Sequence, residues 1–75
     1  MVDKDTNNLY EVTIYFDNGR RKIIKDCTEL KLNNLIRWYD SGTKNIFTMI
    51  IDDKTKIFLD KDKITFISSI ITRGV

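Results

Sequence analysis

Residues 44–52 read Lys-Asn-Ile-Phe-Thr-Met-Ile-Ile-Asp, and this stretch decides the fold of the 75-residue chain. In an extended strand its apolar residues would occupy both faces; they are Ile46, Phe47, Met49, Ile50 and Ile51. That pattern is typical of a strand covered on both sides, so we expect it to lie inside a sheet. One helix can cover one of its faces. The second apolar face therefore predicts contact with loops, with the termini, with another copy or with a partner.

The composition favours a single, sheet-rich domain. Isoleucine occurs 12 times, valine 3 times and threonine 8 times, whereas alanine and proline are absent. These β-branched residues prefer strands. A chain of this length buries roughly 60% of its unfolded surface, so oligomerisation or a bound partner would add useful stability. The 13 basic and 11 acidic residues alternate along the chain and indicate a solvated surface.

The first half of the chain predicts a hairpin. Residues 1–8 are polar and aperiodic, and we interpret them as a flexible leader to a single domain at 9–75. Residues 9–16 then alternate between apolar and polar side chains, as in a half-buried strand. Asn-Gly at 18–19 favours a tight turn into a second strand at 21–27. A two-residue turn would place Ile23 opposite Ile14 on the core face, whereas a bulged three-residue turn would place Ile24 there.

A helix should follow the hairpin. Asp26 and Thr28 are suitable N-caps, which predicts a start near residues 27–29. Gly42 suits a left-handed residue that ends the helix. Trp38 falls roughly 110° from the centre of the apolar stripe, so we expect it to be half exposed. The core-facing stripe follows helical spacing and comprises Leu32, Leu35, Ile36 and Tyr39.

Two more strands complete the expected fold. Residues 56–60 follow a polar turn, and after a second polar turn the isoleucines and Phe66 from residue 64 onward again fill both faces of a strand. The predicted order is ββαβββ. The fold class is α+β, a small single domain with a twisted antiparallel sheet and one helix packed on one face.

Residues typical of enzymes are scarce. The chain has no histidine, and its three glycines form no phosphate-binding loop. The clustered carboxylates, Asp52 with Asp53 and Asp60 with Asp62, lie in predicted turns beside lysines. Cys27 is the single cysteine and is interpreted as a buried, inert side chain. We predict no enzymatic activity, cofactor or metal and, without a signal or membrane span, a cytoplasmic location and no membrane partner.

Nucleic-acid binding is an alternative prediction. Basic residues gather on the first hairpin, and they are Arg20, Arg21, Lys22 and Lys25. In the two-residue register Tyr15 would lie opposite Lys22, and an exposed aromatic on a basic strand can stack a base. The small net charge of +2 limits this prediction to weak binding.

The main prediction is a small non-enzymatic protein-interaction module, either a homo-oligomer or one docked on a larger partner. Its predicted partner-binding residues are Trp38, Tyr15, Ile67 and Ile71. The size and composition resemble those of small accessory proteins of phages and mobile elements, a resemblance that implies binding to, and inhibition of, a host or defence protein. An oligomer that sequesters a small molecule is a further alternative. The partner, the strand order and the oligomer size stay open at this stage.

Overall fold

The computed structural model describes residues 8–74, which confirm the α+β class and the ββαβββ order. Of the predicted leader at 1–8, all but Asn8 lies outside the described residues, as does residue 75. The elements are β1 (Leu9–Phe16), β2 (Arg21–Thr28), α1 (Glu29–Ser41), β3 (Ile46–Ile50), β4 (Lys56–Asp60), a 3-10 turn η2 (Lys61–Lys63) and β5 (Ile64–Arg73).

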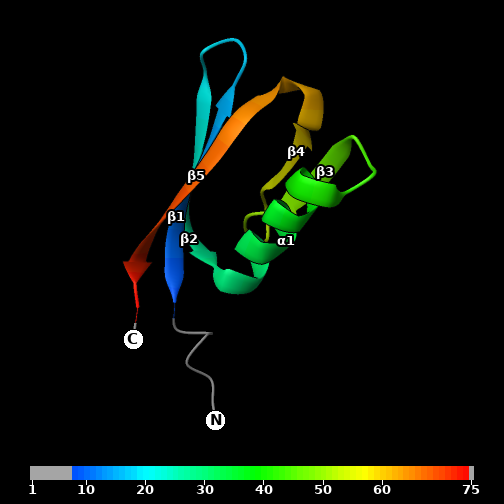
Figure 1. The fold of residues 1–75 in the computed structure, drawn as a ribbon. Coiled ribbons are helices and arrows are strands. Elements are labelled where there is room, and N and C mark those ends of the chain that lie inside the picture. The colour runs from blue at the N-terminus through cyan, green and yellow to red at the C-terminus, as the bar shows by residue number, and fades with distance from the viewer. Residues whose placement is uncertain (1–7, 75) are drawn as a thin grey trace.

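The five strands form two antiparallel sheets rather than one. A three-stranded sheet has the order β2-β1-β5, and β3 pairs with β4 in a separate two-stranded sheet. Helix α1 and the β3–β4 hairpin lie on the same side of the three-stranded sheet (Figure 1). The prediction that residues 44–52 lie inside a sheet is therefore wrong. β3 instead buries Met49 and leaves the opposite face, with Ile46 and Ile50, exposed.

The first hairpin uses the longer of the two predicted turns. Gly19 has a φ of +86°, and its N–H donates to the carbonyl of Phe16 at 3.1 Å. This positive φ is easily adopted because glycine has no Cβ. The turn shifts the register by one residue from the two-residue alternative, so Ile24 pairs with Val12 and is buried while Ile23 is exposed.

A bulge in β2 brings a second residue of that strand to the core. Asp26 has a φ of +55°, and the pairing with β1 shifts between Tyr10 and Val12. Ile24 and Cys27, three residues apart, consequently both face inward. Such a bulge inserts one extra residue against the partner strand. Every strand and the helix contribute to the buried core, which consists of Val12, Ile14, Ile24, Cys27, Leu32, Leu35, Trp38, Met49, Leu59 and Ile64.

Helix α1 begins where the sequence predicts but is rotated from the predicted stripe. Thr28 is the N-cap, and its side chain accepts from the N–H of Lys31 at 3.3 Å. Trp38 is buried, with 7% of its surface exposed, whereas Ile36 is 46% exposed. Both placements correct the prediction. The rotation follows from the position of the β3–β4 hairpin, because the indole of Trp38 stacks on the ring of Phe47 at 5.1 Å.

The end of the helix also differs from the prediction. Gly42 has a φ of −70° and extended backbone, so it is not the left-handed residue expected. Its N–H donates to the carbonyl of Trp38 at 2.9 Å. A Cβ at Gly42 would lie 2.7 Å from that carbonyl oxygen and 2.9 Å from Cδ1 of the indole. Glycine is required here by the close approach of the chain to Trp38 rather than by backbone conformation.

Candidate functional site

One face of the three-stranded sheet is turned away from α1 and the β3–β4 hairpin, and it carries large apolar side chains. The pairings Tyr15 with Phe66 and Thr13 with Ile23 fix which side chains share this face. The rings of Tyr15 and Phe66 are stacked, with centroids 4.3 Å apart and an interplanar angle of 21°. Ile70 is 65% exposed. We call this surface the outer sheet face, and it comprises Tyr15, Ile23, Phe66 and Ile70.

The β3–β4 hairpin has an exposed apolar face of its own. Phe58 is 67% exposed, and Ile46 and Ile50 are also exposed. Thr48 pairs with Phe58, which places all four side chains on the side opposite the buried Met49. The sequence pattern of apolar residues on both faces of residues 44–52 is therefore present in the structure, although no described element covers the second face.

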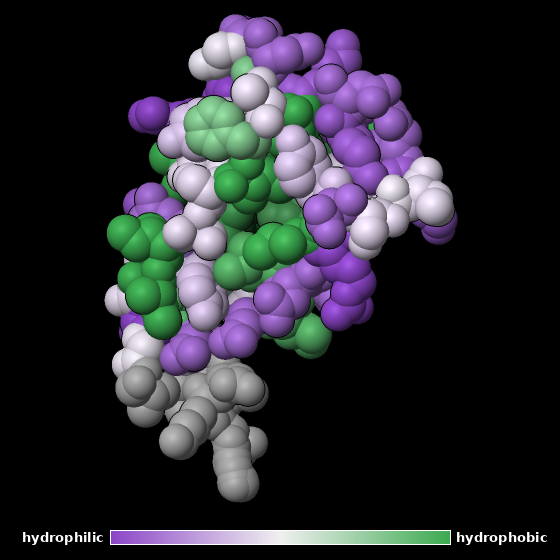
Figure 2. Space-filling model, in the orientation of Figure 1, coloured by the Kyte–Doolittle hydropathy of each residue, from purple (hydrophilic) through white to green (hydrophobic). Residues whose placement is uncertain are grey.

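A third apolar surface lies on the inner face of β5. Ile67 pairs with Ile14 and packs against the core, whereas Ile71 pairs with Tyr10 and is exposed. Figure 2 shows apolar side chains in the hollow between β5 and α1. The exposed Ile36 belongs to α1. The inner face of β5 is thus covered in part by the helix and is open beyond it.

The four predicted partner-binding residues do not form one site. Tyr15 lies on the outer sheet face, whereas Ile67 and Ile71 lie on the opposite face of the same sheet. Trp38 is buried between α1 and the β3–β4 hairpin, where its Nε1 donates to the carbonyl of Lys44 at 2.7 Å. Only Ile67 and Ile71 share a face, the inner face of β5, where they lie four residues apart along the strand. Contact of any of the four with a partner stays a prediction.

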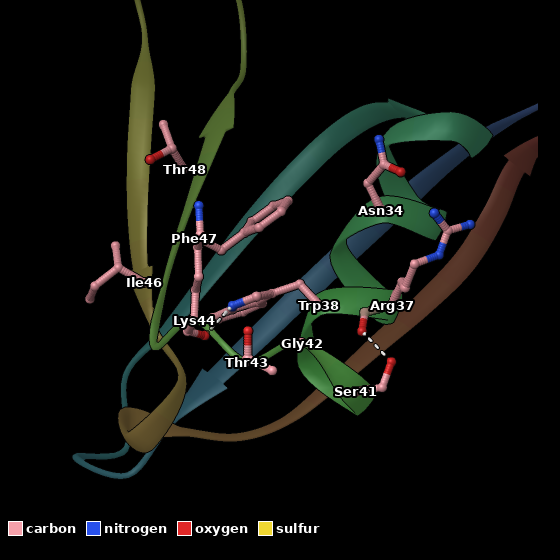
Figure 3. Close-up of a pocket in the computed structure, with 10 residues that line it drawn as sticks. All are labelled: Asn34, Arg37, Trp38, Ser41, Gly42, Thr43, Lys44, Ile46, Phe47 and Thr48. Carbon is pink, nitrogen blue, oxygen red and sulfur yellow. Dashed lines mark hydrogen bonds between the residues drawn. The ribbon is translucent and has the colours of Figure 1, made fainter.

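A hollow of the described surface lies between α1 and β3 (Figure 3). This groove has a volume of about 870 Å³, and the rings of Trp38 and Phe47 point toward one another across its floor. Its described lining includes two cationic side chains, Arg37 and Lys44, and no acidic one. Lys61 contacts the indole as well, because its Nζ lies 5.3 Å from the centre of the ring. The sequence did not reveal this groove, since it depends on the rotation of the helix.

The basic residues of the first hairpin are exposed, as a solvated surface requires, and they are Arg20, Arg21, Lys22 and Lys25. The expected pairing of Tyr15 with Lys22 is wrong, because the three-residue turn pairs Tyr15 with Arg21. On the outer sheet face Tyr15 therefore has Arg21 as its neighbour on β2 and Phe66 as its neighbour on β5.

The clustered carboxylates serve the turns in which they lie. Asp60 accepts from Nδ2 of Asn45 at 2.7 Å and from the N–H of Asp62 at 3.1 Å. Asp52 accepts from the N–H of Lys54 at 2.8 Å, and this hydrogen bond lowers the pKa of the Asp52 carboxyl. Within residues 8–74, no three acidic or cysteine side chains are grouped to hold a metal.

Cys27 lies in the core, and burial raises the pKa of its thiol. The neutral thiol is therefore the stable form at neutral pH, which makes it a poor nucleophile. The part of the chain that the structure describes contains no helix that is long and apolar enough to cross a membrane. No protein-family model, curated protein or solved structure matches the chain.

Proposed function

We propose that this protein is a non-enzymatic binding module that docks on another protein through its outer sheet face. The observation that supports this proposal is the exposure of Phe66, stacked on the Tyr15 ring, and of Ile70 farther along the same strand, on a face away from α1 and the β3–β4 hairpin. Large apolar side chains that gather on one exposed face favour an interaction site there. Burial of apolar area on contact would supply the driving force.

The geometry of the outer sheet face suits an interface. The stacked rings of Tyr15 and Phe66 are held by adjacent strands, so little side-chain freedom is lost when a partner covers them. Arg21 at their side supplies a polar rim. A partner enzyme whose surface was covered in this way would be blocked, which is the inhibitory role that the composition suggests.

The test measures how two matched variants of this protein bind a partner that is captured from the native host and identified by mass spectrometry. Ile70→Lys places a charge in the outer sheet face, whereas Leu30→Lys places the same charge at a helix position that is 71% exposed. We expect Ile70→Lys to weaken binding by about tenfold or more, the cost of a residue that contributes over 1 kcal/mol. Leu30→Lys should bind as the wild type does. Equal binding by both variants and the wild type would contradict the proposal.

Weak nucleic-acid binding is the second candidate function. The stack of Tyr15 and Phe66 beside Arg21, on an open antiparallel sheet, is an arrangement that can hold an unpaired base. A single-stranded oligonucleotide titrated at rising salt tests it, because phosphate contacts weaken steeply with salt. Arg21→Gln should reduce both the affinity and the salt dependence. A partner protein held by apolar contacts would instead be retained as the salt is raised.

A further inference from the structure

Strand β5 has one open edge over its regular middle stretch, residues 66–71, between a bulge at Thr65 and another at Thr72. It pairs with β1 on one side, and no other described strand pairs with it. The N–H of Phe16 donates to Arg20 on the β2 side, and the N–H of Asp17 donates to Lys63 on the β5 side. Backbone groups in an antiparallel ladder alternate between the two neighbours. The odd residues of β1 therefore bond to β5.

This alternation identifies which residues of β5 face the open edge. Phe66, Ser68 and Ile70 are paired with odd residues of β1, so their N–H and C=O groups point to β1. The backbone groups of the residues between them point the other way. Within the described chain, the open edge is therefore formed by the backbone of Ile67, Ser69 and Ile71.

The middle of the open edge lacks the features that normally prevent strands from pairing. Natural edge strands are short, carry proline, present charged side chains, are bulged or are covered. The bulges of β5 and the contact of the Tyr39 hydroxyl with the Thr65 carbonyl lie at its two ends, outside residues 66–71. β5 is 10 residues long, contains no proline and has no charged side chain from Ile64 to Thr72. The other described edge strands are β3 and β4, of 5 residues each, and β2, which carries four charged side chains among its 8 residues. Among the described strands, β5 is consequently the one whose edge is most suited to accept another strand.

We propose that β5 pairs antiparallel with β5 of a second copy about a twofold axis at Ser69. This inference goes beyond the proposed function, because it uses the edge of the sheet rather than its outer face. In this register Ser69 faces Ser69 of the second copy, and Ile67 faces Ile71 of the second copy. Ser69 is the centre of residues 67–71 in the regular stretch, and Arg73 lies beyond that stretch at each end of the pairing, so no two cations meet. Two three-stranded sheets would join into one sheet of six strands.

The same pairing covers apolar surface that the single chain leaves open. The hydroxyl of Tyr39 donates to the carbonyls of Ile64 and Thr65 at 3.3 and 3.2 Å, so this side of α1 faces β5. Ile36 precedes Tyr39 by three residues and lies on the same side of the helix. The second copy of β5 would place its inner side chains beside the exposed Ile36 and Ile71.

Cysteine cross-linking tests both the pairing and its register. Facing residues in a hydrogen-bonded antiparallel pair have Cβ atoms about 5.5 Å apart, beyond the roughly 4 Å of a direct disulfide, so a short thiol-to-thiol cross-linker is the suitable reagent. This reagent should link most of the Ser69→Cys protein into a dimer. Ser68→Cys is the matched control, because Ser68 is exposed but lies on the other face of β5. The wild-type chain, with Cys27 buried, gives the background.

Proline substitution tests the pairing in the native chain by sedimentation. The N–H of Ser69 points to the open edge, so Ser69→Pro should leave the β1 ladder intact and remove the dimer. Ser69→Thr keeps the N–H and should remain dimeric. We expect the wild type at twice the chain mass of 8.9 kDa and Ser69→Pro at that mass. Circular dichroism establishes that the proline variant is folded.

Three results would overturn the pairing: a wild type that sediments as a monomer, cross-linking of Ser68→Cys in preference to Ser69→Cys, or no cross-linking of either variant. Each of these leaves the proposed function standing, because that function depends on Ile70 and the outer sheet face. Loss of partner binding by Ile70→Lys while Ser69→Cys still cross-links would show that the two surfaces act independently, and it would support both.

Discussion

Replacing Trp38 by alanine should remove a large part of the stability of the fold. The side chain is 7% exposed and stacks on Phe47, and Nζ of Lys61 lies over the ring. Truncation of a buried tryptophan to alanine costs about 3–5 kcal/mol through lost burial and the cavity left behind. A chain of this size has a total stability of roughly 4–11 kcal/mol at the usual contribution per residue. The variant should therefore be marginally folded at room temperature.

Two further variants separate the parts of this loss. Trp38→Phe keeps an aromatic ring but removes the 2.7 Å hydrogen bond from Nε1 to the carbonyl of Lys44. That bond should contribute about 0.5–1.5 kcal/mol. Leu30→Ala is the exposed control and should change stability by less than about 0.5 kcal/mol. Urea unfolding followed by far-UV circular dichroism measures all three. A loss below about 1 kcal/mol for Trp38→Ala would refute the assignment of Trp38 to the core.

Three other perturbations test separate parts of the fold. Gly42→Ala places a Cβ 2.7 Å from the carbonyl oxygen of Trp38 and should cost roughly 1–3 kcal/mol in urea unfolding; an unchanged midpoint would mean that the chain there yields easily. Burial raises the pKa of the Cys27 thiol above 9.0. The stability that the neutral buried thiol contributes should therefore be present at neutral pH and be lost as the pH rises through that raised value. Cys27 should also react with a thiol reagent far more slowly in the folded chain than in urea. The N–H of Lys54 holds the pKa of Asp52 below 3.8, so the stabilisation from this carboxylate is complete above 3.8 and is lost as pH falls through the lowered value. Asp52→Asn should flatten the acid limb of a melting-temperature profile, and an unaltered limb would exclude this carboxylate as its cause.

Local patterns in the sequence predicted most of the elements. The alternation in residues 9–16 correctly assigned Val12 and Ile14 to the core face, and Thr28 correctly marked the start of the helix. The two turn types at Gly19 were both compatible with the sequence, because a glycine accepts either geometry. These features are local, since each depends on a few neighbouring residues.

The features that the sequence did not predict depend on distant parts of the chain. Ile36 and Trp38 are both apolar and flank Leu35 on opposite sides of the helix, so the helical pattern alone could not decide to which side the buried stripe extends. The β3–β4 hairpin decides it by presenting Phe47 to the indole. The bulge at Asp26 requires a positive φ at a residue that rarely adopts it, and pairing with β1 imposes it. The groove between α1 and β3 follows from the same helix rotation.

The central position of β1 has a consequence for the order of folding. β1 pairs with β2 through a short turn, but its other partner, β5, comes from the far end of the described chain, where Leu9 faces Arg73. Closing so long a loop costs more entropy than forming the helix or either hairpin, and non-local pairing of this kind slows folding. The first hairpin, α1 and the β3–β4 hairpin should therefore form early, with docking of β5 as the slow step. During synthesis, β1 keeps an unpaired edge until β5 has emerged, and in that interval the growing chain is most exposed to misassembly.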